Sequence, residues 1–136
     1  MSEPMDGMRN CVIVEWLFER RVVTVRIEST MPDVIDAWYE TSLEVIQNWP
    51  EDKPYLFLGN FTNLGLTPYS RQCAEKLALA IPKDMSGRVA VVISRGILGY
   101  GLRMFGINRL KALIPNLPVE FFFEETKALA WLEELL

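Results

Sequence analysis

The chain has 136 residues, half of them hydrophobic, and its formal net charge at pH 7 is −4. A chain of this length is expected to form a single domain over residues 1–136 and to bury roughly two-thirds of its unfolded surface. The mild negative charge argues against a nucleic-acid-binding module, which normally carries a basic stripe. The sequence has no histidine, so the commonest general base and the commonest metal ligand are both missing.

The N-terminal segment predicts neither a signal peptide nor a regular element. Residues 1–10 (MSEPMDGMRN) lack an apolar core, and residues 1–9 are expected to be flexible. The best candidate for a membrane-spanning helix, near residues 95–114, is interrupted by Arg103 and Arg109 before it reaches the roughly 18 apolar residues that are needed. Two cysteines without metal-type spacing, at positions 11 and 73, are expected to be small buried residues. We therefore expect a cytoplasmic protein.

The first part of the chain predicts a hairpin and an amphipathic helix. Residues 11–18 (CVIVEWLF) and 22–27 (VVTVRI) favour two antiparallel strands, although the turn between them lacks the usual glycine. Ser29 or Thr30 is the expected N-cap of a helix that runs from about Pro32 to about residue 48. This helix carries an acidic row, which we interpret as a solvated face: Asp33, Asp36, Glu40 and Glu44.

The rest of the chain alternates strands with helices. Strands are expected at residues 55–58, 89–93 and 119–123, and helices at residues 67–81, at 95–114 and from 124 onward. Thr67 and Pro68 form an N-cap and N1 pair. Alternating strands and helices imply parallel pairing with right-handed crossovers, so the order β-β-α-β-α-β-α-β-α predicts an α/β fold with a mixed sheet of about five strands.

Residues 95–114 (RGILGYGLRMFGINRLKALI) form the most unusual segment, because the expected helix is apolar nearly all round and its charges are all positive. Gly96, Gly99 and Gly101 have the spacing GxxGxG rather than GxGxxG, so we interpret them as sites of close helix packing and not as a nucleotide-binding loop. Three interpretations of the apolar face stay open. They are core packing, a homodimer or partner interface, and contact with an anionic membrane or a lipid.

The element order and the closing residues 121–136 (FFFEETKALAWLEELL) resemble the STAS domain, the fold of anti-sigma-factor antagonists, and its SpoIIAA-like or STAS/SEC14-like branch. The resemblance covers nearly the whole chain from Val12. It implies a mixed sheet with strands in near-sequential order and a non-enzymatic regulatory role. In phosphorylated STAS proteins the acceptor hydroxyl lies in a D-S-x-G-type motif where the third strand gives way to its helix. The matching residues 59–67 lack the Asp-Ser pair, so Thr67 is the candidate phospho-acceptor, with a plain capping role as the alternative.

The sequence contains no catalytic constellation that we can identify. A G-x-S-x-G motif is missing, a Ser–His pair is impossible, and the neighbours Glu124 and Glu125 point in different directions on a helix start. We expect no enzyme, no cofactor and no metal.

The leading hypothesis is a regulatory or protein-binding domain. A protein partner, including a second copy of the chain, would contact residues 62–70 and part of the apolar helix: Gly99, Leu102, Arg103, Phe105 and Arg109. The alternative is SEC14-like binding of a lipid or apolar ligand, which needs a cavity under helix 95–114, or peripheral membrane association through that helix.

Overall fold

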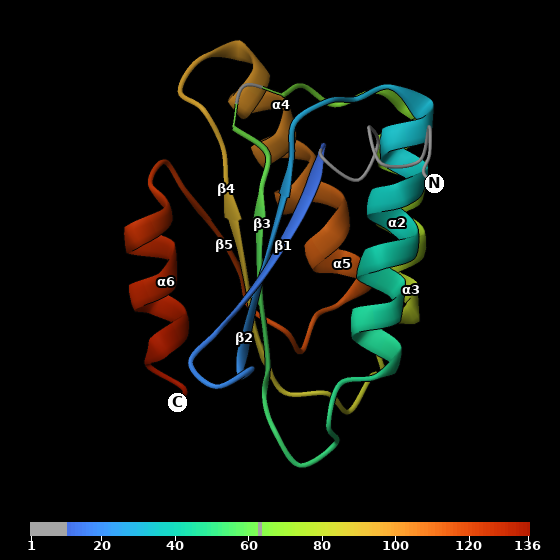
Figure 1. Cartoon of the computed structure of the whole chain (residues 1–136). Coiled ribbons are helices and arrows are strands. Elements are labelled where there is room, and N and C mark those ends of the chain that lie inside the picture. Colours follow the sequence, from blue (N-terminus) through green and yellow to red (C-terminus); the bar gives the residue numbers. More distant parts are fainter. Residues whose placement is uncertain (1–10, 63) are drawn as a thin grey trace, which may run out of the picture.

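The computed structural model describes residues 11–62 and 64–136, which form one mixed sheet with helices on both faces (Figure 1). The expectation for residues 1–9 lies outside the described residues. The strands lie in the order β1 (Val12–Leu17), β2 (Val22–Ile27), β3 (Tyr55–Asn60), β4 (Gly87–Val92) and β5 (Val119–Phe122). β1 pairs with β2 in antiparallel fashion, and the other neighbours pair in parallel. The predicted α/β class and element order are confirmed.

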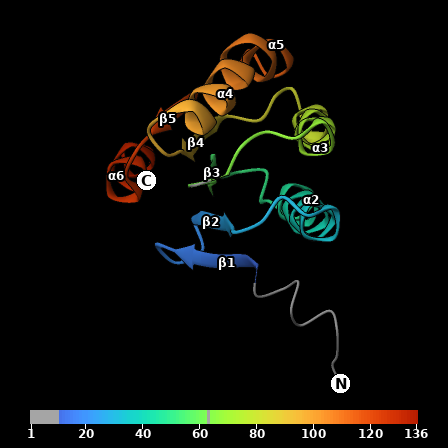
Figure 2. The same cartoon turned by 90° about the horizontal axis from the view of Figure 1, so that it is seen from above.

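The helices fall on the two faces of the sheet unequally (Figure 2). On one face lie α2 (Pro32–Gln47), α3 (Pro68–Ala80) and a continuous segment of α4 (Ile97–Phe105), η1 (Gly106–Leu110) and α5 (Lys111–Leu113). Each of these connects two parallel strands, and right-handed crossovers along a sheet that advances in one direction put every connecting helix on the same face. α6 (Glu125–Glu133) follows the last strand and covers the opposite face.

Alternation along the strands divides the core into two layers. Val23, Val25 and Ile27 pack with α2, whereas Val22 packs with α6, as the period-two pattern of residues 22–27 predicts. The acidic row of α2 is exposed, so its interpretation as a solvated face is confirmed. Cys73 is buried as expected, whereas Cys11 is only half-buried.

Two local expectations need correction, and the expected hairpin without glycine has a structural explanation. The N-cap of α2 is Met31 and not Ser29 or Thr30, although the Ser29 Oγ accepts a hydrogen bond from the Met31 amide at 3.1 Å. β3 extends to Asn60 because its last residues pair with β4. The hairpin closes without glycine because residues 18–20 all adopt positive φ angles of 53°, 57° and 66°, a left-handed conformation that costs non-glycine residues about 1–2 kcal/mol each.

Candidate ligand-binding cavity

A cavity of about 130 Å³ lies between the sheet and the three helical segments on the α2 face. Its helical walls come from α2 (Ile35, Trp38, Ser42, Ile46), α3 (Ser70, Ala74, Leu77, Ala78) and the α4–α5 segment with the residue after it (Leu102, Phe105, Leu110, Ile114). The strands contribute residues at alternate positions, such as Val89 and Val91 on β4. Residues far apart in the sequence therefore line one space, which is partly open to solvent.

Short side chains on α3 explain why this space is not filled. Ala74 and Ala78 are four residues apart, so they lie on the same face of the helix, one turn from each other. Both line the cavity, and neither extends beyond Cβ into it. An apolar cavity of about 150 Å³ is large enough to bind benzene or xenon, so a cavity of about 130 Å³ can hold a molecule of similar size.

Two buried polar atoms of α2 belong to residues that line the cavity. Trp38 is 6% exposed and Ser42 is 1% exposed. Neither the Trp38 Nε1 nor the Ser42 Oγ has a hydrogen-bond partner among the described residues. Burial also raises the pKa of the Tyr55 hydroxyl, so this lining phenol stays neutral.

Two glycines allow close contacts of the α4–α5 segment, one with the loop after β4 and one with β5. A Cβ at Gly99 would lie 1.8 Å from the carbonyl oxygen of Ser94, and one at Gly106 would lie 2.1 Å from the ring of Phe121. Close packing is thus confirmed for Gly99, whereas it is wrong for Gly96 and Gly101, because a Cβ at either position would have no atom within 4 Å. The predicted helix over residues 95–114 contains a π-helical turn at Gly106–Leu110, a feature that often occurs at functional sites.

The structure separates the residues that the sequence suggested as a partner or lipid surface. Gly99 is buried, and Leu102 and Phe105 are half-buried and line the cavity. Arg103 and Arg109 are exposed, and the Nε of Arg109 donates to a carboxylate oxygen of Glu75 at 3.1 Å. These five residues therefore do not share one surface. The apolar residues that do face outward on α4 are Ile97 (89% exposed), Leu98 (50%) and Tyr100 (64%).

Thr67, the candidate phospho-acceptor, caps α3 as predicted. Its Oγ1 accepts a hydrogen bond from the Ser70 amide at 3.1 Å, and the Ser70 hydroxyl accepts one from the Thr67 amide at 2.9 Å. The nearby Thr62 hydroxyl lies 2.7 Å from Oδ1 of Asn60 and donates to it. Both hydroxyls are therefore engaged in local hydrogen bonds, and phosphorylation of Thr67 stays a prediction.

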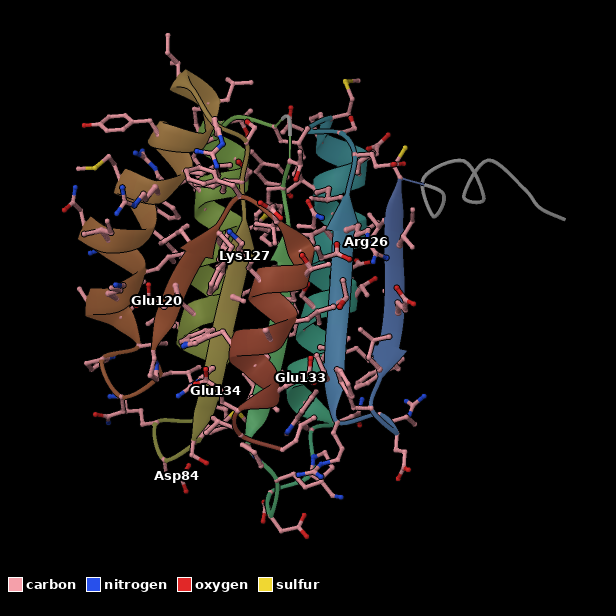
Figure 3. All side chains as sticks on the ribbon, turned by 90° about the vertical axis from the view of Figure 1, so that its left-hand side faces the viewer. Arg26, Asp84, Glu120, Lys127, Glu133 and Glu134 are labelled. Carbon is pink, nitrogen blue, oxygen red and sulfur yellow. The ribbon has the colours of Figure 1, made fainter. Side chains whose placement is uncertain are left out.

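An ion-pair network that the sequence did not predict lies on the other face of the sheet, where Figure 3 labels Arg26 beside α6. The Arg26 guanidinium binds the Glu125 carboxylate, with Nε 2.9 Å from Oε2, and the Asn60 amide donates to the same oxygen at 2.7 Å. The hydrogen bond from Arg26 is the main cause that lowers the pKa of Glu125. Arg26 and Glu125 are 99 positions apart, so no local sequence pattern could have paired them.

Comparison of the chain with models of known protein families, with curated proteins and with solved structures found no match. The resemblance to STAS domains therefore stays a prediction that rests on the sequence pattern. Within residues 11–62 and 64–136, each helix is either too short or too polar to cross a lipid bilayer. The same residues bring together no group of three or more Cys, Asp or Glu side chains that could hold a metal ion.

Proposed function

We propose that this protein binds a small apolar ligand in the cavity between the sheet and the helices α2, α3 and α4–α5. The observation that supports this function is an apolar space of about 130 Å³ inside a domain whose other layer is closely packed. Concave, mostly apolar spaces are the usual sites at which proteins bind small molecules.

This proposal follows the alternative that the sequence left open, because that alternative required a cavity under helix 95–114. Leu102 and Phe105, which the protein-binding hypothesis needed on the surface, line the cavity instead. The volume fits a single ring better than a whole lipid. We therefore assign the protein a binding role for small apolar molecules.

A cavity-filling substitution tests the proposal. Benzene or toluene at saturating concentration should raise the unfolding temperature of the wild-type protein, because a ligand that binds only the folded state stabilises it by mass action. Ala74→Leu should abolish this rise, since the larger side chain occupies the cavity. Ala80→Leu is the matched control: Ala80 lies on the same helix but is exposed, so that variant should respond to the ligands as the wild type does.

The two variants also define the result that would contradict the proposal. If neither ligand shifts the unfolding temperature of the wild type, and no methyl resonance of a cavity residue moves on titration, the cavity does not bind apolar molecules. If Ala74→Leu and Ala80→Leu lose the response equally, the ligand binds elsewhere.

A second candidate function is docking on an anionic membrane surface, which the exposed end of α4 favours. Ile97 is 89% exposed and Tyr100 64%, and the neighbouring Arg95 and Arg103 are also exposed. Exposed apolar side chains flanked by arginines suit the boundary between lipid headgroups and acyl chains. Their placement also suits a protein that takes an apolar ligand from a membrane.

Vesicle co-sedimentation tests this second function. The wild type should sediment with vesicles that contain phosphatidylserine and stay in solution with pure phosphatidylcholine, and Ile97→Asp should abolish sedimentation. Leu79→Asp is a suitable control, because Leu79 is a similarly exposed apolar residue (68%) on α3. Equal sedimentation of the two variants, or a dimer in light scattering that Ile97→Asp disrupts, would contradict membrane docking.

A further inference from the structure

We infer that a groove between β5 and the α4–α5 segment binds an extended, acidic segment of a partner protein, which pairs with the free edge of β5 as a further strand of the sheet. The segment carries an acidic, an apolar and an acidic side chain at successive alternate positions. The inference goes beyond the proposed function, because the groove and the cavity share Phe121 alone among their described lining residues.

The outer edge of β5 has backbone groups that are free to pair with another strand. β5 is the last strand in the sheet order and pairs with β4 along its inner edge. The carbonyl oxygens of Pro118 and Phe122 both accept hydrogen bonds from β4 or the residue after it, at 2.9 Å. Backbone groups alternate between the two sides of a strand, so those of Val119 and Phe121 point away from β4. Extended peptides add to a sheet at an edge of this kind.

A groove of about 190 Å³ lies beside this edge. Figure 3 shows β5 between α6 and the α4–α5 segment, with Glu120 labelled. The lining of the groove combines charged and apolar side chains from the helical segment and from β5 with the residue after it: Arg103, Ile107, Lys111, Glu120, Phe121 and Phe123. Ile107 is 39% exposed and Phe123 is 47% exposed, so an apolar side chain of a partner can bury surface against them.

The groove carries more positive than negative charge, although the whole chain has a formal net charge of −4. Arg103 and Lys111 are exposed, and neither forms a salt bridge with a carboxylate of the described residues. Arg109 on the same segment differs, because it pairs with Glu75 at 3.1 Å. Two cations without a counter-ion in a negatively charged protein favour an acidic partner.

The neighbours of these two cations leave them available to a partner. Phe122 packs in the α6 layer, so alternation along β5 directs Glu120 toward that face, away from the helix that carries the cations. Arg95 adds positive charge at the Phe123 end of the groove, where its guanidinium lies 4.2 Å from the ring centroid. The acidic side chains of the partner are therefore assigned to the α4–α5 side.

The spacing of the cations defines the pattern of the partner segment. Arg103, Ile107 and Lys111 follow one another at intervals of four residues, and all three line the groove. At a rise of about 1.5 Å per residue, the two cations are about 12 Å apart along the helix, and four residues of a strand span about 13 Å. Because alternate side chains of a strand share a face, an acid-x-apolar-x-acid segment can place one side chain opposite each of the three residues.

Synthetic peptides labelled with a fluorophore test the inference by anisotropy at low ionic strength. A peptide with the core Glu-Thr-Val-Thr-Glu should bind the wild-type protein. Lys-Thr-Val-Thr-Lys should bind at least about tenfold more weakly, because both ion pairs become like-charge contacts. The core Glu-Glu-Val-Thr-Thr has the composition of the first peptide but places its acids on opposite faces, so it should bind about twofold to fivefold more weakly.

Substitutions in the α4–α5 segment assign the binding to the groove. Arg103→Gln and Lys111→Gln should each weaken binding of the first peptide by about twofold to fivefold. Arg109→Gln is the matched control, because Arg109 lies on the same segment but pairs with Glu75 and is not a lining residue of the groove. It should bind as the wild type does. Glu120→Gln removes the negative charge of the lining and should tighten binding.

Two further comparisons separate strand pairing and the cavity from the charge effect. Peptides N-methylated at complementary sets of alternate residues should differ, because the amides of one set face β5 and those of the other set face away. One of these peptides should lose binding and the other should keep it. Ala74→Leu fills the cavity and should bind the first peptide as the wild type does, so a failure of the proposed function leaves this result unchanged.

Several results would overturn the inference. It is wrong if the glutamate and lysine peptides bind equally, if Arg109→Gln loses as much affinity as Arg103→Gln, or if both N-methylated peptides bind equally. It is also wrong if the first peptide does not bind. In that case, sedimentation with phosphatidylserine vesicles that Lys111→Gln abolishes would assign the groove to a membrane, and a dimer that Lys111→Gln dissociates would assign it to a second copy of the chain.

Discussion

The two faces of the sheet use similar apolar residues but pack them differently. On the α6 face, Leu56, Leu58 and Leu132 are completely buried, and they form one closed cluster with Ala90 and Ala128. On the opposite face, three helical segments cover the same strands and enclose a cavity of about 130 Å³. The cavity is therefore a property of one layer and not a sign of loose packing throughout the domain.

The difference arises from how the helices are held. α6 is bound to the sheet at both ends, by Arg26 at its N-terminus and by Arg88 near its C-terminus. The Nη1 of Arg88 lies 2.7 Å from both the Trp131 carbonyl oxygen and the Glu134 carboxylate. On the other face, Gly106 brings the helix against Phe121, while short side chains on α3 leave space nearby. Stability and ligand binding should therefore respond to different substitutions.

Truncation of a buried leucine on each face should give the largest difference between the two layers. Leu132→Ala should lower the free energy of unfolding by about 2–5 kcal/mol, as is usual for a closely packed leucine. Leu77→Ala should cost only about 1–2 kcal/mol, because the Leu77 side chain already borders empty space and has fewer contacts to lose. Urea denaturation at pH 7 measures both values.

The same pair of variants carries its own control. Leu77→Ala enlarges the cavity and should accept larger apolar ligands, whereas Leu132→Ala should leave the ligand preference unchanged. Equal losses of stability in the two variants would mean that the helices on the α2 face pack as closely as α6 does.

Glu125→Gln should reveal a pH-dependent contribution that belongs to the α6 face. The pKa of Glu125 is lowered from 4.5, chiefly by Arg26, so its contribution to stability is present above the unfolded pKa and is lost as the pH falls through the folded pKa. The variant should be less stable than the wild type by about 1–2 kcal/mol at pH 7. This difference should shrink below about pH 4.

Glu124→Gln provides the control for that experiment. Glu124 is exposed, and its carboxylate lies 3.8 Å from the Lys127 ammonium group, a surface pair worth about 0–1 kcal/mol. Urea denaturation at pH 7, 5 and 3 should show little change for this variant. The same pH profile for both variants would show that the network with Arg26 does not hold α6.

Sequence patterns predicted which residues face each layer of the fold, because the burial of a strand or helix residue follows the local periodicity of apolar residues. Alternation in residues 22–27 identified which side chains of β2 point to each layer, and Thr67 with Pro68 marked the start of α3. The turn of the hairpin was harder, because Phe18, Glu19 and Arg20 adopt a left-handed conformation that their residue types do not favour. The ends of elements were therefore less predictable than their order.

The candidate site depended on non-local geometry that the sequence could not supply. The wheel of residues 95–114 showed excess apolar surface, but only the tertiary structure shows that Leu102 and Phe105 face a cavity while Ile97 and Tyr100 face outward. The sequence also could not show that the small side chain of Ala74 leaves space unfilled, because this depends on how α3 packs against the sheet. Ser42 drew no attention in the sequence, because a serine on an amphipathic helix is ordinarily solvated.

The smallest expected effect comes from removing a buried hydroxyl group on each face of the sheet. Ser42→Ala and Thr24→Val each remove a buried oxygen that has no hydrogen-bond partner among the described residues, so each should raise the free energy of unfolding of the unliganded protein by about 1 kcal/mol. Urea denaturation at pH 7 measures both values. A loss of stability in either variant would mean that its hydroxyl makes a hydrogen bond in solution, for example with a buried water molecule.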